Sequence, residues 1–196
     1  MAKLYLEELQ AAMSSDIFTR LETDKQEATA VKDKITSFVS SSKETLTGKI
    51  YDGYRTQFDT FCTTMNQRIS LADKLSTSIK EALQLLIDYM EGDLYLDTSR
   101  LNEYYNSKSA CESSIERLKQ MLNSPNVSNA SDISNQIALA EQTLAEINRI
   151  IKKLEGLDAV YGQAESILNS AFSEISPFGS SVSSIKPNGI YSYHLT

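Results

Sequence analysis

The chain contains few residues of the types that carry out catalysis. It has one histidine, His194, and two cysteines, Cys62 and Cys111. A Ser-His or Cys-His site needs a base held within hydrogen-bond reach of its nucleophile, whereas His194 lies in a serine-rich stretch with the composition of a linker. The sequence also lacks a Gly-rich phosphate loop and a CxxC pair. We therefore expect a protein that is not an enzyme and that needs no cofactor.

The acidic residues and the cysteines do not form a metal-ligand pattern. Acidic residues such as Glu7, Glu8 and Asp33 are spread at helical spacing among polar neighbours, which is typical of solvated helix faces. The cysteines are too few for a disulfide framework and too far apart in sequence for a zinc site. We expect no metal site, and we expect Cys62 and Cys111 to be reduced residues of the core.

Composition and charge limit which fold classes and which kinds of partner are possible. The 196 residues include only seven glycines and three prolines, whereas a many-stranded barrel or sandwich needs a turn about every 8–12 residues. The formal net charge of -7 gives no electrostatic basis for binding nucleic acid or an anionic membrane. No segment reaches the roughly 18 apolar residues of a membrane span. Glu7 and Glu8 interrupt the N-terminal segment where a signal peptide would need an apolar core, so any export would require another machine.

Apolar spacing predicts two long helices in the N-terminal half. From Lys3 to about Ser41, apolar residues recur every three or four positions, with a softening at Ser14-Ser15-Asp16. A second stripe, from Ile50 to Met90, has a mean spacing of about 3.6 residues, the α-helical repeat. The second helix, from about Thr47 to Glu91 with Gly92-Asp93 after it, would be roughly 65 Å long.

The C-terminal half predicts shorter helices. A third helix is expected from Ser99 to Met121, with Asp97 or Thr98 as its N-cap. Folding the second and third helices back on each other would set Cys111 level with about residue 77, too far from Cys62 for a disulfide. After a polar loop at 123–130, a fourth helix should run from Ser131 to near Gly156, and a shorter fifth from Leu157 to Ile175.

These elements define the expected fold class. It is all-α: an elongated antiparallel helical hairpin or bundle with two long N-terminal helices and two to three shorter helices. Residues 1–175 should form the helical domain. Residues 176–196, with two prolines, many serines and no acidic residue, have the composition of a linker-like tail.

One motif is more specific than the helical pattern around it. Residues 46–52 read Leu-Thr-Gly-Lys-Ile-Tyr-Asp and lie where the first long helix gives way to the second. Gly48 could simply be the glycine of a helix-loop-helix turn. The motif residues are Leu46, Gly48, Lys49, Tyr51 and Asp52.

With its surroundings, this motif resembles the LXG domain, the N-terminal module of polymorphic toxins exported by type VII (ESX-type) secretion systems. The resemblance includes the opening Leu4-Tyr-Leu-Glu-Glu-Leu9, the signature at 46–52, the aromatic continuation after it and the link Asp93-Leu-Tyr-Leu-Asp97. LXG proteins normally carry a C-terminal toxin domain. The chain is thus expected to be either the export domain of a longer toxin or a relative without one.

The resemblance implies a non-catalytic targeting domain. Such a domain is made in the cytoplasm, binds small helical partners similar to Trp-x-Gly proteins, and is secreted without a leader by the type VII machinery, in competition between bacteria. A long helix with a continuous apolar stripe also leaves an apolar surface for a partner helix. The candidate partner-binding residues are Tyr54, Phe58, Phe61, Met65 and Ile69. The alternatives are that these residues form intramolecular core, or that the protein is a cytoplasmic coiled-coil scaffold that associates with itself.

Overall fold

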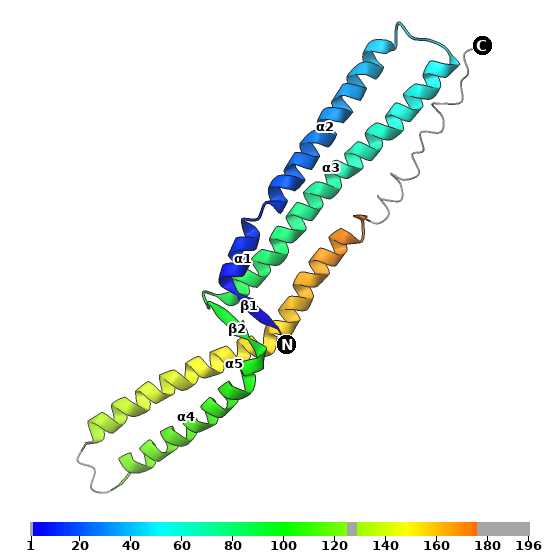
Figure 1. The fold of residues 1–196 in the computed structure, drawn as a ribbon. Helices are drawn as coiled ribbons and strands as arrows, with labels where there is room; N and C mark the ends of the chain where they lie inside the picture. The colour runs from blue at the N-terminus through cyan, green and yellow to red at the C-terminus, as the bar shows by residue number, and fades with distance from the viewer. Residues whose placement is uncertain (1, 125–128, 176–196) are drawn as a thin grey trace. The chain divides into compact units, whose positions relative to one another are not determined.

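The computed structural model of the protein describes residues 2–124 and 129–175, which are almost entirely helical. The expected all-α class is confirmed. The elements follow the order β1 (Lys3–Tyr5), α1 (Leu6–Met13), α2 (Ile17–Ser42), α3 (Lys49–Met90), β2 (Tyr95–Asp97), the 3-10 helix η1 (Thr98–Arg100), α4 (Leu101–Leu122) and α5 (Ala130–Phe172) (Figure 1). His194 and the predicted tail at 176–196 lie outside the described residues.

The chain divides into two compact units. The first unit comprises Met1–Gln10 and Leu86–Gly162, and the second comprises Ala11–Leu85 and Gln163–Thr196. The chain therefore passes from the first unit to the second within α1, returns to the first near the end of α3, and enters the second again within α5. The division into these units does not test the predicted domain boundary at residue 175, which stays a prediction.

In the first unit, a short strand pair joins segments that are far apart in the sequence. β1 and β2 pair antiparallel, with Leu4 opposite Leu96, and both of these leucines are buried. The Lys3 carbonyl oxygen accepts a hydrogen bond of 2.9 Å from the Tyr161 hydroxyl of α5. The expectation of one helix from Lys3 onward was wrong in its first turn, because residues 3–5 take their backbone partners from β2 instead.

The first unit also contains a pair of helices, α4 and the part of α5 up to Gly162. Asp97 is the predicted N-cap: its carboxylate accepts a hydrogen bond of 2.8 Å from the Ser99 backbone N–H and starts η1, which leads into α4. Lys119 of α4 pairs with Glu141 of α5 at 2.8 Å. The Cys111 thiol lies 3.3 Å from the Ala140 carbonyl oxygen, also in α5.

The expected pairing of the second helix with the third was therefore wrong. Cys111 was predicted to lie level with about residue 77 of α3, but its neighbour is α5, because β2 and not a helix-to-helix turn follows α3. The Cys62 thiol lies against α2, 3.8 Å from the Thr36 hydroxyl. Both cysteines are free and half-buried.

The second unit is built on an antiparallel pair of helices, α2 and α3. Asp24 and Arg68 form a salt bridge near one end of the pair, and Phe38 meets Phe58 edge to face near the other, with ring centroids 5.7 Å apart. As residue numbers rise along α2, their partners on α3 fall in number. The chain breaks between α1 and α2 at residues 14–16, where the sequence predicted a softening.

The predicted end of a helix at Gly156 was wrong. α5 runs without interruption from Ala130 to Phe172, so the expected fourth and fifth helices are one element. Gly156 serves close packing instead: a Cβ built there would lie 2.5 Å from the Tyr89 hydroxyl oxygen. That hydroxyl donates a hydrogen bond of 2.6 Å to the Lys153 carbonyl oxygen. The absence of a Cβ at Gly156 therefore leaves the space in which the Tyr89 side chain packs against α5.

Candidate functional site

The signature residues lie together at the turn from α2 to α3. Leu46 and Gly48 are in the turn, and Lys49 is the first residue of α3. Gly48 has a φ of 111°, a backbone conformation that residues with a Cβ adopt at a cost. A Cβ at this position would meet nothing within 4 Å. The glycine is therefore required by the backbone of the turn and not by close approach of the two helices.

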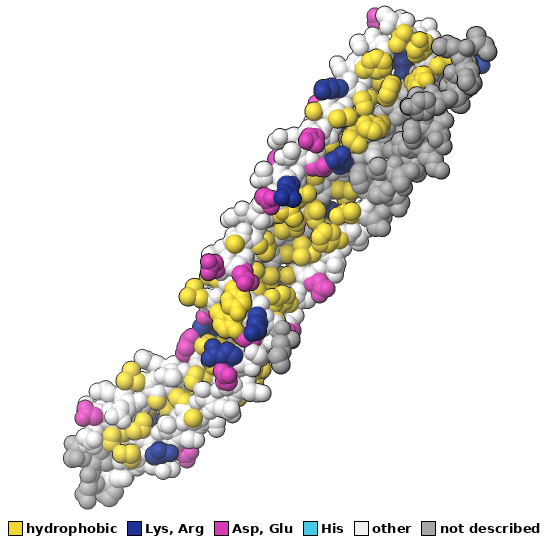
Figure 2. Space-filling view, in the orientation of Figure 1, with side chains coloured by type: hydrophobic (Ala, Val, Ile, Leu, Met, Phe, Trp, Pro, Cys, Tyr) yellow, Lys and Arg dark blue, Asp and Glu magenta, His cyan; other side chains and the backbone are white. Residues whose placement is uncertain are grey.

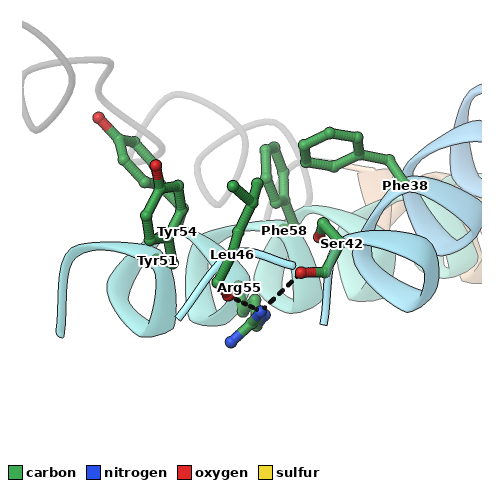
Figure 3. A pocket seen from close by; sticks show the side chains of 7 residues that line it. All are labelled: Phe38, Ser42, Leu46, Tyr51, Tyr54, Arg55 and Phe58. Carbon is green, nitrogen blue, oxygen red and sulfur yellow. Dashed lines mark hydrogen bonds between the residues drawn. The ribbon is translucent and has the colours of Figure 1, made fainter. Parts of the chain in front are cut away.

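An arginine that the sequence did not single out closes this turn. The Arg55 guanidinium donates hydrogen bonds to the carbonyl oxygens of Ser42, at 3.2 Å, and of Leu46 (Figure 3). It also donates to the Asp52 carboxylate at 3.0 Å. The last carbonyls of a helix have no partner within the helix, and a guanidinium carries several donors in a fixed plane. Arg55 thus holds the C-terminal end of α2 against the first turns of α3. The signal in the sequence was the three-residue spacing of Asp52 and Arg55 on one helix.

An aromatic pocket of about 230 Å³ opens beside this turn. Its lining consists of residues from the end of α2, the turn and the start of α3: Phe38, Ser42, Leu46, Tyr51, Tyr54, Arg55 and Phe58 (Figure 3). The sides of the pocket are mainly apolar, and two of its aromatic residues are well exposed, Phe38 at 52% and Tyr51 at 40%. We call this set of residues the turn pocket.

The turn pocket contains part of the predicted set. It brings together Leu46 and Tyr51 of the signature with Tyr54 and Phe58 of the candidate partner-binding residues. Lys49 and Asp52 are exposed beside it and do not line it.

The other candidates lie further along α3. Phe61 and Ile69 are half-buried, whereas Met65 is buried, at 8% exposure. Met65 therefore belongs to the core between the helices, in agreement with the alternative interpretation for that residue. Phe38 of α2, which belongs to the turn pocket, was placed in the apolar stripe by the sequence but was not a site candidate.

A charged cluster in the first unit is structural in character. The Lys153 side chain is 10% exposed, and its ammonium contacts the Met90 carbonyl oxygen and the Asp93 carboxylate, each at 2.8 Å. The Arg149 guanidinium donates two further hydrogen bonds to Asp93, at 2.7 and 2.8 Å. These hydrogen bonds, with those from Lys153, lower the pKa of Asp93 to about 2. The cluster ties the end of α3 to the middle of α5.

Neither a metal site nor a membrane span is found in the described part of the chain. Among residues 2–124 and 129–175, no group of three or more His, Cys, Asp or Glu side chains is arranged to hold a metal ion. Over the same residues, no helix has the length and apolar character needed to cross a bilayer.

Comparison with protein families, with curated proteins and with solved structures gives no match to this chain. The resemblance to LXG domains therefore depends on the residues of the motifs and on their order along the sequence.

Proposed function

We propose that the chain is a non-catalytic targeting domain of the LXG type, which binds small helical partner proteins for export by a type VII secretion system. The observation that supports this proposal is the turn pocket. Signature residues Leu46 and Tyr51 form an apolar, partly open surface there together with aromatic residues of α2 and α3.

Exposed apolar side chains around the turn pocket support a protein partner. Phe38, Tyr51 and Ile50 are exposed at 52%, 40% and 54%, and Val31 on α2 is exposed at 42%. Figure 2 shows hydrophobic side chains gathered along one face over α2 and α3. Single exposed apolar residues need no explanation, but a continuous group of them marks an interaction surface. An amphipathic helix laid along the two helices would cover such a surface.

The binding test uses exposed residues, whose substitution leaves the core intact. The full chain is co-expressed with the small helical proteins encoded beside it, and affinity is measured with the purified components. Phe38→Ser and Tyr51→Ser should each weaken binding at least about tenfold, because each removes an aromatic contact at an interface. Leu139→Ser is the matched control, since Leu139 is an apolar residue exposed at 63% on α5. Equal affinities for all three variants would refute the proposed surface.

The export test addresses the secretion machinery. In a host with the type VII system, the protein should reach the medium, and deletion of the secretion ATPase should abolish its export. Phe38→Ser should reduce export to the extent that it reduces partner binding. Export that continues without the ATPase would refute the targeting role.

The rival function, a scaffold that associates with itself, predicts a different result in light scattering. The purified chain alone would then form a stable homodimer or larger oligomer that Phe38→Ser dissociates. Under our proposal the chain alone is monomeric or poorly soluble, and a helical partner restores its solubility.

A further inference from the structure

The end of α5 packs on α3 at a point well short of the turn pocket. Lys74 of α3 forms a salt bridge with Glu174, just after the last residue of α5. In Figure 1 the end of α5 lies beside α3, which continues toward its own N-terminal end and the α2–α3 turn. From Lys74 back to Phe58 is 16 residues of helix, or about 24 Å. Over this length α2 is the described helix that packs on α3.

The face of α3 along this stretch is apolar and incompletely covered. Phe58, Phe61 and Ile69 lie on it and form one stripe of the helix together with Met65. Met65 is buried, whereas the other three are half-buried. The stripe leads directly into the turn pocket, where Phe58 is a lining residue. An apolar strip about 24 Å long that ends in a pocket can accept a peptide segment as well as a whole partner.

The chain itself supplies a segment of suitable length and composition. Residues 176–196 follow directly on the anchor at Glu174, and they contain no acidic residue and one lysine. Their apolar residues are Phe178, Val182, Ile185, Ile190, Tyr191, Tyr193 and Leu195. To span about 24 Å, an extended chain needs about 7 or 8 residues and a helical one about 16. The 21 residues present are enough in either case.

We propose that residues 176–196 bind to the apolar face of α3 between Lys74 and Phe58 and reach into the turn pocket of the same chain. The covalent link at Ile175 raises the effective concentration of the segment to the millimolar range. A weak intrinsic affinity therefore suffices to occupy the pocket. Burial of the aromatic lining residues, together with Phe178 or another apolar residue of the segment, supplies the driving force.

This intramolecular contact does not depend on the proposed export function, but it changes how that function would be carried out. If a helical partner also binds at the turn pocket, segment and partner compete, and the partner must displace the segment. Removing the segment should then increase the affinity for the partner. The factor of this increase should equal the factor by which the chain with the segment bound is favoured over the chain with the segment released.

The first test compares the full chain with a variant that stops after Ile175, by hydrogen exchange. Backbone amides of residues 49–61 should exchange at least about threefold faster in the shortened chain, because the face they lie on loses its cover. Amides of α4, in the first unit, serve as the internal control and should not change. A synthetic peptide of residues 176–196, added in excess, should restore the protection, whereas a peptide of the same composition in scrambled order should not. Equal exchange of residues 49–61 in both chains would overturn the proposal.

The second test uses the full-length chain and needs no truncation. A photo-reactive phenylalanine analogue at Phe178, and separately at Tyr191, should form cross-links within one chain to peptides from α3 or from the turn. Cross-links to the first unit, cross-links between two chains, or none to α3 or the turn would each overturn the proposal. Neither test contains a partner protein, so a failure here leaves the binding and export tests of the proposed function unaffected.

Discussion

At the scale of single residues, Gly156 and Tyr89 show how a side chain can fix the contact between two helices. The Tyr89 hydroxyl lies in the space that a Cβ at Gly156 would occupy, and burial raises the pKa of Tyr89. Its hydrogen bond to the Lys153 carbonyl oxygen satisfies the polar end of a half-buried ring.

Gly156→Ala should destabilise the fold by about 1–3 kcal/mol, because the added methyl group displaces the Tyr89 hydroxyl and breaks its hydrogen bond. Gly162→Ala is the matched control in the same helix, since a Cβ there meets nothing within 4 Å. It should stabilise by about 0.5–1 kcal/mol through helix propensity. Urea unfolding measures both changes. Tyr89→Phe should recover part of the loss in the Gly156→Ala background, and two alanine variants with the same sign would contradict this account.

The Asp93 cluster makes stability depend on pH in a defined window. The pKa of Asp93 in the folded chain is about 2, below its ordinary value of 3.8. A lowered pKa means that the carboxylate stabilises the fold fully above about pH 4, and that this contribution is lost as the pH falls from 4 toward 2. The size of the shift corresponds to about 2 kcal/mol.

Asp93→Asn should therefore lower the free energy of unfolding at pH 7 by about 2 kcal/mol or more, because it also removes one of the two carboxylates, Asp93 and Glu91, that pair with the Lys153 ammonium. The gap between variant and parent should narrow as the pH falls from 4 to 2. Denaturant unfolding at a series of pH values measures the gap. Asp59→Asn, at an exposed position of α3, should show a gap within about 0.5 kcal/mol. A gap for Asp93→Asn that stays constant down to pH 2 would refute the assignment.

At the scale of elements, the α2–α3 turn depends on one glycine and one arginine. Gly48→Ala should destabilise by about 1–3 kcal/mol, since its φ of 111° strains any residue with a Cβ. Gly53→Ala, five residues later in α3 and also without a neighbour within 4 Å, should be neutral or stabilising. Thermal or chemical unfolding of the two variants measures the difference. Gly48→Leu should in addition weaken partner binding, and unchanged co-purification would show that the turn does not support the interface.

Arg55 should not be replaceable by lysine. Arg55→Lys keeps the charge but cannot donate to the Ser42 and Leu46 carbonyl oxygens at once, so we expect a loss of about 1–2 kcal/mol in unfolding experiments. Arg20→Lys changes an exposed pair with Asp16 and should cost about 0–0.5 kcal/mol. If the two lysine variants were equally stable, Arg55 would not be the residue that closes the turn.

At the scale of the whole molecule, net charge limits the partners. With a formal charge of -7, the chain should bind duplex DNA and anionic vesicles with dissociation constants weaker than about 0.1 mM at physiological salt. Fluorescence anisotropy and vesicle flotation measure the two affinities. Submicromolar binding that weakens steeply with salt would contradict the assignment to protein partners.

Periodicity predicted most of the helices because it depends on neighbours in sequence. The stripe from Ile50 to Met90 repeats every 3.6 residues whatever packs on it, and α3 accordingly spans Lys49–Met90. The same reasoning placed the end of α2 near Ser41 and located α4 to within two residues at its start. For the site, it located the signature at the turn and four residues of the turn pocket.

The hydrophobic periodicity could not predict contacts between segments that are far apart in the sequence. Three-residue strands are too short to show a period of two, so the pairing of β1 with β2 followed only from bringing residues 3–5 and 95–97 together. Gly156 was interpreted as a helix end because a glycine tolerates both a turn and a close contact, and only Tyr89, 67 positions earlier in the sequence, decides between them. By itself the sequence determined the all-α class and the helical faces, which are local properties of hydrophobic spacing. The tertiary structure alone decided which helices pair and which exposed aromatic residues gather into one pocket. These properties depend on contacts that no local spacing encodes.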